Sequence, residues 1–173
     1  MVMKNVVDKL RGGERRSIGQ ANEVAKEISG DRKKFAQVFA AMTDEDAVVR
    51  MRAADAVEKA SAAIPELLQL FAREMLHKVA AVEQQEVRWH VAQMLPRLRL
   101  KPRDRGLAVA ILLEYLEDRS SIVRTFAIQG LADFAVQDER LRARVIPILE
   151  KLTSTGSPAM RARGRKLLKT LQR

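Results

Sequence analysis

The sequence predicts an all-α fold in which pairs of helices stack into a solenoid. Apolar–arginine pairs recur at intervals of 38, 36 and 37 residues, at Val49-Arg50, Val87-Arg88, Val123-Arg124 and Met160-Arg161. After each pair, apolar or small residues follow at spacings of 4, 4 and 3 residues, which is the spacing of one buried helix face. A period near 37 with one such helix per repeat is typical of helical solenoids. Aromatic residues make up only 4% of the chain, so we expect small aliphatic side chains to fill the core.

The first 30 residues do not share the register of these repeats. Short apolar stretches flank the Gly12-Gly13 pair, the first around Val6 and Leu10 and the second from Ile18 to Ile28. Because glycine pairs interrupt helices, we expect two short helices over residues 1–30. They would form a degenerate pair that caps the stack.

The rest of the chain is expected to form four helix-pair repeats. Their predicted boundaries are 31–62, 63–100, 101–137 and 138–173. The first helix of each pair is predicted at about 32–42, 65–80, 105–117 and 140–152. Neither helix of a pair can bury its apolar stripe alone, so stacked neighbours build one core. We therefore expect residues 1–173 to be a single repeat domain.

The second helix of each pair has a start signal of its own, four residues before the arginine. The residues at this position are Asp46, Gln84, Ser120 and Ser157. Aspartate and serine are favoured N-caps because their side-chain oxygens accept a hydrogen bond from an unpaired backbone N–H. Pro158 follows in the first turn of its helix, where proline is tolerated. Asp31 is the expected cap of the first helix of repeat one.

The segment from Thr43 to Ala54 resembles the turn and second helix of HEAT repeats. In that family a turn aspartate precedes the arginine by six residues, as Asp44 precedes Arg50 and Asp118 precedes Arg124. The family also places a proline in the first helix, and Pro147 stands at that position in repeat four. The resemblance covers residues 31–172. It implies a right-handed α-α superhelix, that is, a HEAT-like solenoid.

Two departures from the family pattern have structural consequences. Val82 and Thr155 replace the turn aspartate in repeats two and four, so the aspartate–arginine ladder between repeats should be incomplete. Pro65 stands early in repeat two and implies a longer first helix there. We expect structural roles for Asp44, Arg50, Asp118 and Arg124.

The candidate partner-binding residues lie on the second helices of repeats one and two. They are Met51, Arg52, Arg88, Trp89 and His90. Arg88 lacks a turn aspartate, which leaves it freer to meet a ligand. Trp89 is the only tryptophan and stands outside the buried stripe, where it suits a binding hot spot or a base-stacking platform. The alternative is a tryptophan that lies flat over the next repeat.

The net charge of +10 is concentrated in two short segments. Residues 97–105 contain five basic residues and one acidic residue, and residues 156–173 contain six basic residues and no acidic one. Such clusters attract polyanions. The candidate polyanion-binding residues are Arg97, Arg99, Lys101, Arg103, Arg105, Arg163, Lys166 and Lys169. The alternative is a solvated loop and a charged end cap that keep the solenoid soluble.

Nothing in the sequence favours catalysis. The chain has no cysteine, and its two histidines, His77 and His90, stand in different repeats without metal-ligand spacing. A glycine-rich phosphate loop is also absent, so no metal and no cofactor are expected. No apolar run reaches the roughly 18 residues of a membrane span, and we expect a cytoplasmic protein.

The sequence thus predicts a non-catalytic scaffold that binds another protein through its concave helix face. The alternative is nucleic-acid binding through residues 97–105 and 156–173. Partner, oligomeric state and pathway stay open.

Overall fold

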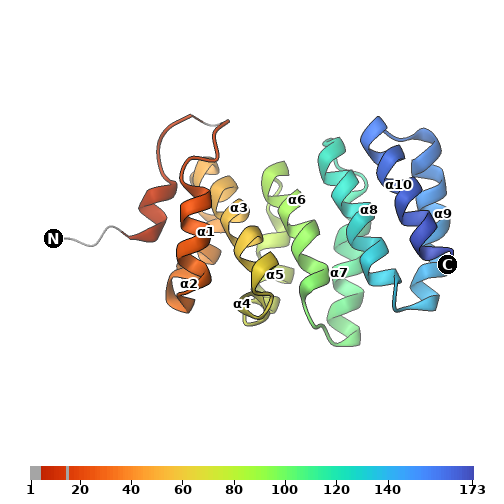
Figure 1. Ribbon diagram of the computed structural model, residues 1–173, viewed down its shortest axis with the longest axis horizontal. Helices are drawn as coiled ribbons and strands as arrows, with labels where there is room; N and C mark the ends of the chain where they lie inside the picture. The colour runs from red at the N-terminus through yellow and green to blue at the C-terminus, as the bar shows by residue number, and fades with distance from the viewer. Residues whose placement is uncertain (1–4, 15) are drawn as a thin grey trace. The chain divides into compact units, whose positions relative to one another are not determined.

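In the computed structural model, which describes residues 5–14 and 16–173, every regular element is a helix (Figure 1). This confirms the all-α prediction. The structure divides into two compact units, residues 1–98 and residues 99–173. The division falls two residues before the predicted boundary between repeats two and three. A single repeat domain over 1–173 stays a prediction.

The first unit consists of two rows of helices. The elements are η1 (Val6–Leu10), α1 (Ala21–Ser29), α2 (Arg32–Ala40), η2 (Ala41–Thr43), α3 (Ala47–Ala63), α4 (Glu66–Gln69), α5 (Ala72–His77), η3 (Val79–Ala81), α6 (Gln85–Met94) and η4 (Leu95–Arg97), where η marks a 3-10 helix. The row of second helices consists of α1, α3 and α6, and α3 packs against both of the others (Figure 1). In the other row, Phe71 stacks on Phe39 of α2 with ring centroids 4.6 Å apart.

The second unit consists of two helix pairs. They are α7 (Pro102–Tyr115) with α8 (Ser121–Ala135), and α9 (Glu139–Thr155) with α10 (Pro158–Leu171). Helix α8 packs against α7, α9 and α10, and α10 also packs against α9. Helix α8 therefore lies at the centre of this unit.

Most of the predicted caps are confirmed. Asp31 accepts hydrogen bonds from the backbone N–H groups of Lys33 and Lys34, and Asp46 accepts one from Val48. In the second unit, Ser120 and Ser157 cap α8 and α10 in the same way. The Gln84 side chain makes no capping bond to α6.

The aligned columns of the repeats form the core. Val49, Ala53, Val57 and Ala60 on α3 are at most 1% exposed, and the equivalent residues of the later repeats are buried, except Leu168, which is half-buried. Ala, Val and Leu predominate among these residues. Short side chains at these positions let neighbouring helices approach closely.

The prediction of one continuous helix over 65–80 is wrong. This stretch is divided into α4, α5 and η3, and Leu70 at the first break is 69% exposed. Adjacent pairs of residues, Leu67-Leu68, Met75-Leu76 and Val79-Ala80, are all buried. On one straight helix these pairs would spread over a wider arc than the stripe that faces the core. The breaks in the helix reorient the later pairs toward the core.

Gly164 sets the approach of α10 to α9. A Cβ atom at this position would overlap the hydroxyl of Thr153, which is buried and has no hydrogen-bond partner among the described residues. Gly164→Ala should therefore lower the free energy of unfolding by about 1–3 kcal/mol, the cost of overpacking a tight site. Urea denaturation followed by circular dichroism measures the change.

Gly106→Ala is the matched control, because a Cβ atom at Gly106 in α7 meets nothing within 4 Å. This variant should be stabilised by about 0.5–1 kcal/mol. Adding Thr153→Ala to Gly164→Ala should recover most of the lost stability. Equal effects of Gly164→Ala and Gly106→Ala would contradict the packing argument.

Candidate functional site

The structure brings the predicted partner-binding residues together on two neighbouring helices but buries two of them. Met51 and Arg52 lie on α3, and Arg88, Trp89 and His90 lie on α6, which packs against α3. Arg52 is 2% exposed and His90 is 9% exposed, whereas the other three are half-buried. The expectation that all five are accessible to a partner is therefore wrong.

Arg52 holds the amino-terminal loop. Its guanidinium donates hydrogen bonds to four backbone carbonyl oxygens, those of Leu10, Gly12, Glu14 and Ser17, at 2.5–3.0 Å. The Leu10 carbonyl stands at the end of η1 and the other three lie in the loop that follows, and a buried carbonyl without a donor costs free energy. The role of Arg52 is therefore structural.

The loop is shaped to admit this guanidinium. Gly13 and Gly19 have φ angles of +75° and +53°, a conformation that favours glycine. A Cβ atom on Gly19 would lie 2.9 Å from the Arg52 Cζ atom. Glycine at this position therefore provides both the backbone conformation and the space.

His90 belongs to a chain of polar contacts across the second helices of the first unit. Its Nε2 atom lies 3.8 Å from the Asp55 carboxylate on α3. Asp55 accepts a hydrogen bond of 2.6 Å from Lys59, which also donates one of 2.7 Å to Asn22 on α1. Burial lowers the pKa of His90 and outweighs the opposing effect of Asp55 and Glu58. These contacts align α1, α3 and α6.

The same contact recurs in the second unit. Arg163 on α10 occupies the repeat position of His90, and it donates a hydrogen bond of 2.8 Å to Gln129 on α8. Asp55 and Gln129 both stand six residues after the first core residue of their repeats. In repeats two and four this position therefore contacts the second helix of the preceding repeat. The sequence contains a signal for this contact. A polar residue three positions after the first core residue of one repeat meets a polar residue six positions after the first core residue of the preceding repeat.

Arg88 is not freed by the missing turn aspartate. Arg50 donates a hydrogen bond of 2.8 Å to the backbone carbonyl of Asp44, and Arg88 donates one of 3.3 Å to the carbonyl of Val82. In both cases the acceptor is a backbone atom six residues earlier, so it persists when the aspartate is replaced. The interpretation of Arg88 as free for a ligand is wrong on this ground.

The turn aspartates stabilise the turns themselves. The carboxylates of Asp44 and Asp118 accept hydrogen bonds from the backbone N–H groups two residues later, at 2.9 and 2.8 Å. Arg50 also donates to Gln84, whose amide donates to the carbonyl of Ala47. The structural role predicted for Arg124 stays a prediction.

Three of the five predicted partner-binding residues stay partly exposed, namely Met51, Arg88 and Trp89. We call these three residues the Trp89 face. Met51 and Arg50 line a hollow of about 310 Å³ between the amino-terminal turns of α3 and α6, together with Ala47, Val48, Gln84, Glu86 and Arg16. The Trp89 ring is tilted against the His90 ring, with the centroids 5.7 Å apart. Trp89 is therefore a half-buried aromatic side chain on α6, the helix whose first turn borders this hollow.

Several of the predicted polyanion-binding residues are engaged within the protein. Arg97 forms an ion pair with Glu58 and donates a hydrogen bond of 2.8 Å to the Glu58 carbonyl. Arg105 forms an ion pair with Asp138. Arg163 is bound to Gln129, as described above. The other five are exposed, namely Arg99, Lys101, Arg103, Lys166 and Lys169, and Arg99 also interacts within the protein.

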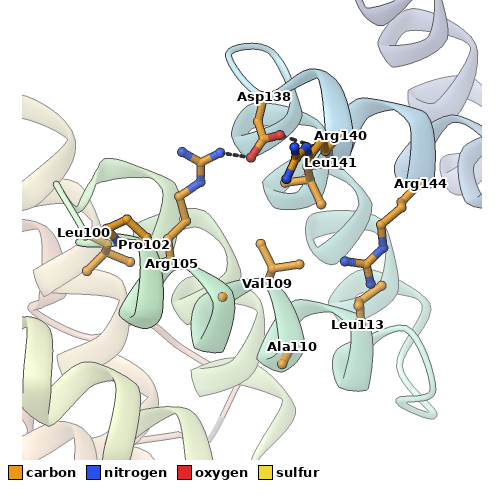
Figure 2. Close-up of a pocket in the computed structure, with 11 residues that line it drawn as sticks. Leu100, Pro102, Arg105, Val109, Ala110, Leu113, Asp138, Arg140, Leu141 and Arg144 are labelled. Carbon is orange, nitrogen blue, oxygen red and sulfur yellow. Dashed lines mark hydrogen bonds and ion pairs between the residues drawn. The ribbon is translucent and has the colours of Figure 1, made fainter.

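Sequence reasoning missed a groove in the second unit. It lies between α7 and α9, has a volume of about 500 Å³ and is lined by apolar residues and by Arg105, Arg140 and Arg144 (Figure 2). Arg140 and Arg144 lie in the segment 106–155, which also contains acidic residues. The net charge of this segment therefore does not reveal the two arginines. We call this the α7–α9 groove.

The described part of the chain offers neither a metal-binding cluster nor a membrane-spanning helix. Among those residues, no group of three or more His, Asp or Glu side chains is arranged to hold a metal ion. No helix in that part of the chain combines the length and the apolar character needed to cross a membrane.

Comparisons with known proteins bear on the fold. A family model described as a HEAT repeat domain matches residues 8–132. A crystal structure of an engineered protein is similar to this chain with a TM-score of 0.62 and 18% sequence identity, over 96% of this chain and 78% of the other. At that identity the likeness shows the fold alone. No curated protein matches the sequence. The predicted helical-repeat fold is confirmed, while the handedness of the superhelix stays a prediction.

Replacing Arg52 should destabilise the first unit. Arg52→Met leaves four loop carbonyls without their donor, so we expect a loss of about 2–4 kcal/mol in the free energy of unfolding. Trp89 is the only tryptophan and lies in this unit, so its fluorescence in urea measures the loss. Hydrogen exchange at residues 11–14 and 16–20 should also become faster.

The matched control for Arg52 is Arg73→Met, which removes an exposed arginine from α5 of the same unit. It should change the stability by less than about 0.5 kcal/mol. Equal stabilities of the two variants would show that the Arg52 hydrogen bonds contribute little.

His90 should make the stability of the first unit depend on pH. Because its folded pKa is lowered from 6.5, the unfolded chain takes up the proton first as the pH falls. The free energy of unfolding should be unaffected by His90 above about pH 7.5 and should decrease below about pH 6.5, by at most about 1.4 kcal/mol per pH unit. Urea midpoints between pH 5.5 and 8 measure this slope.

His90→Gln should flatten the slope, whereas His77→Gln, which replaces the exposed histidine of α5, should leave it unchanged. The same slope in both variants would mean that another group titrates.

Proposed function

The chain belongs to the HEAT-repeat family, and we propose that it is a non-catalytic scaffold that binds another protein through the second helices of its repeats. The observation that supports this best is the Trp89 face. The chain's single tryptophan is half-buried on α6, and the amino-terminal turns of α3 and α6 border a hollow of about 310 Å³ that Met51 helps to line. The proposal includes a cytoplasmic location and requires no cofactor.

The chemistry of this face suits protein recognition. Tryptophan and arginine are enriched among the residues that contribute most to binding between proteins, and methionine is enriched at interfaces. A partner that covers Trp89 would remove the rest of its apolar surface from water. Glu86 and Arg16 at the rim of the hollow supply charges of both signs for orientation.

The buried residues next to this face support the proposal in another way. Arg52 and His90 connect the helices that carry Met51 and Trp89 to their neighbours. A face held by such contacts loses little conformational freedom when a partner binds, which favours affinity. Residues first interpreted as contacts would then act as supports.

A second candidate is polyanion binding, and one observation favours it. Helix α10 presents exposed Arg165, Lys166 and Lys169 around a hollow of about 450 Å³, in a segment without acidic residues. Exposed Lys101 and Arg103 belong to the same unit. Because Arg97, Arg105 and Arg163 have partners within the protein, fewer charges remain for phosphates than the sequence suggests.

Trp89→Ala should abolish partner binding. Affinity capture from an extract of the source cells identifies proteins that bind the wild-type chain, and the dissociation constant is then measured with the purified partner. We expect Trp89→Ala to weaken binding at least about 30-fold, as for a hot-spot residue. Raising the salt concentration from about 50 to 200 mM should change the wild-type affinity little.

Ile122→Ala is the matched control, since it removes a 47% exposed apolar side chain from α8 in the other unit. It should leave the affinity unchanged. The proposal fails if Trp89→Ala binds as tightly as the wild type. It also fails if the ligand is a nucleic acid whose binding depends steeply on salt and is abolished by Lys101→Glu and Lys166→Glu.

A further inference from the structure

The α7–α9 groove lies between the first helices of the two repeats of the second unit. Helices α7 and α9 both pack against α8, and the groove separates them (Figure 2). It is lined only by residues 100–113 and 138–144, so no part of α8 or α10 closes it. Its volume of about 500 Å³ lies within the range of binding pockets.

One wall of the groove is an apolar face of α7, on which Val109 is buried at 7% exposed and Leu113 is half-buried. Leu107 to Leu113 are seven consecutive apolar residues, so this helix is apolar on every side over two turns. Helix α7 packs on α8, and it has one fully buried stripe, formed by Ala108, Leu112 and Tyr115. Val109, Ala110 and Leu113 line the groove instead, and Ala110 is exposed. A helix that is apolar all round is ordinarily buried all round.

The rim of the groove is positively charged. Arg105 is neutralised by Asp138, whose carboxylate also caps α9 through the N–H of Leu141 at 3.0 Å. The hydrogen bond from the Leu141 N–H is the main cause that holds the pKa of Asp138 below its ordinary value, and the nearby Arg105 and Arg140 lower it further. Arg140 and Arg144 are exposed on α9, and Arg144 makes no ion pair with any residue in 5–14 or 16–173. Two positive charges therefore remain beside an apolar wall.

We propose that the α7–α9 groove binds an acidic amphipathic helix of another protein. Apolar side chains of that helix would cover Ala110 and the exposed part of Leu113, and its carboxylates would pair with Arg140 and Arg144. The two arginines are four residues apart and lie about 6 Å apart along the axis of α9. Carboxylates four residues apart on a helix have the same spacing, and a groove that takes the apolar face of a helix is a recurring mode of recognition.

The lining favours a peptide over a nucleic acid. A phosphate backbone needs many cations and gains nothing from an apolar wall, and the Asp138 carboxylate stands at the edge of the groove. An acidic peptide supplies a few charges together with apolar side chains. This groove lies in the second unit and the Trp89 face in the first, so the inference does not depend on the proposed function.

The test uses the full chain and a displayed library of peptides of about 16 residues. The selected peptides should be rich in Asp and Glu and should carry apolar residues at helical spacing. A labelled peptide from the selection should bind Arg140→Glu/Arg144→Glu and Ala110→Glu at least about 10-fold more weakly than the wild type, by fluorescence anisotropy. Arg119→Glu, an exposed arginine outside the groove, and Trp89→Ala should bind as the wild type does.

A second readout locates the peptide. The chain has no cysteine, so Ala110→Cys places a single thiol in the groove and Arg119→Cys a single thiol outside it. Saturating peptide should slow alkylation of the first thiol at least about 10-fold and leave the second unchanged. The inference is overturned if the selected peptides are neutral or basic, or if the groove variants bind normally. Loss of DNA-duplex binding in Arg140→Glu/Arg144→Glu would overturn it in favour of nucleic acid.

Discussion

The structure depends on backbone carbonyl groups in turns and loops, which no helix satisfies and which arginine side chains bind. Arg52 binds four such carbonyls, Arg50 binds two in the turn before α3, and Arg88 binds one in the turn before α6. In the second unit, Arg142 binds the carbonyls of Ala135 and Val136 at the end of α8. A guanidinium carries five donors and stays charged, so one side chain can satisfy several carbonyls at once.

This use of arginine changes what the net charge of +10 means. Positive charges that bind carbonyls or pair with carboxylates hold repeats together, and they attract distant anions less than exposed charges do. Arg97, Arg105 and Arg163 were candidates for polyanion binding, and each has a partner within the protein. Among the basic residues that stay exposed are Arg140 and Arg144 at the α7–α9 groove and Arg165, Lys166 and Lys169 on α10. A basic composition in a helical-repeat protein therefore overstates its affinity for polyanions.

Both surfaces proposed for binding arise where the repeat pattern leaves an apolar side chain without cover. Trp89 stands where the other repeats have Met51, Thr125 and Ala162, so its size exceeds what that position buries. Helix α7 is apolar over two whole turns, although one stripe is enough to pack on α8. Polar contacts hold the neighbouring helices in place in both cases, through His90 and through the ion pair of Arg105 with Asp138. Excess apolar surface on a supported helix is what a binding scaffold needs.

The sequence by itself determined the period of the repeats, the starts of most second helices and the buried columns. Each of these follows from local spacing or from one capping side chain such as Asp46 or Ser120. Only the tertiary structure decided the breaks within 65–80, the burial of Arg52 and His90, and the groove beside Arg144. The exposure of a side chain depends on which residue of the adjacent repeat, about 30 to 40 residues away in sequence, packs against it. Periodicity predicts which face of a helix is buried, but it does not identify that residue.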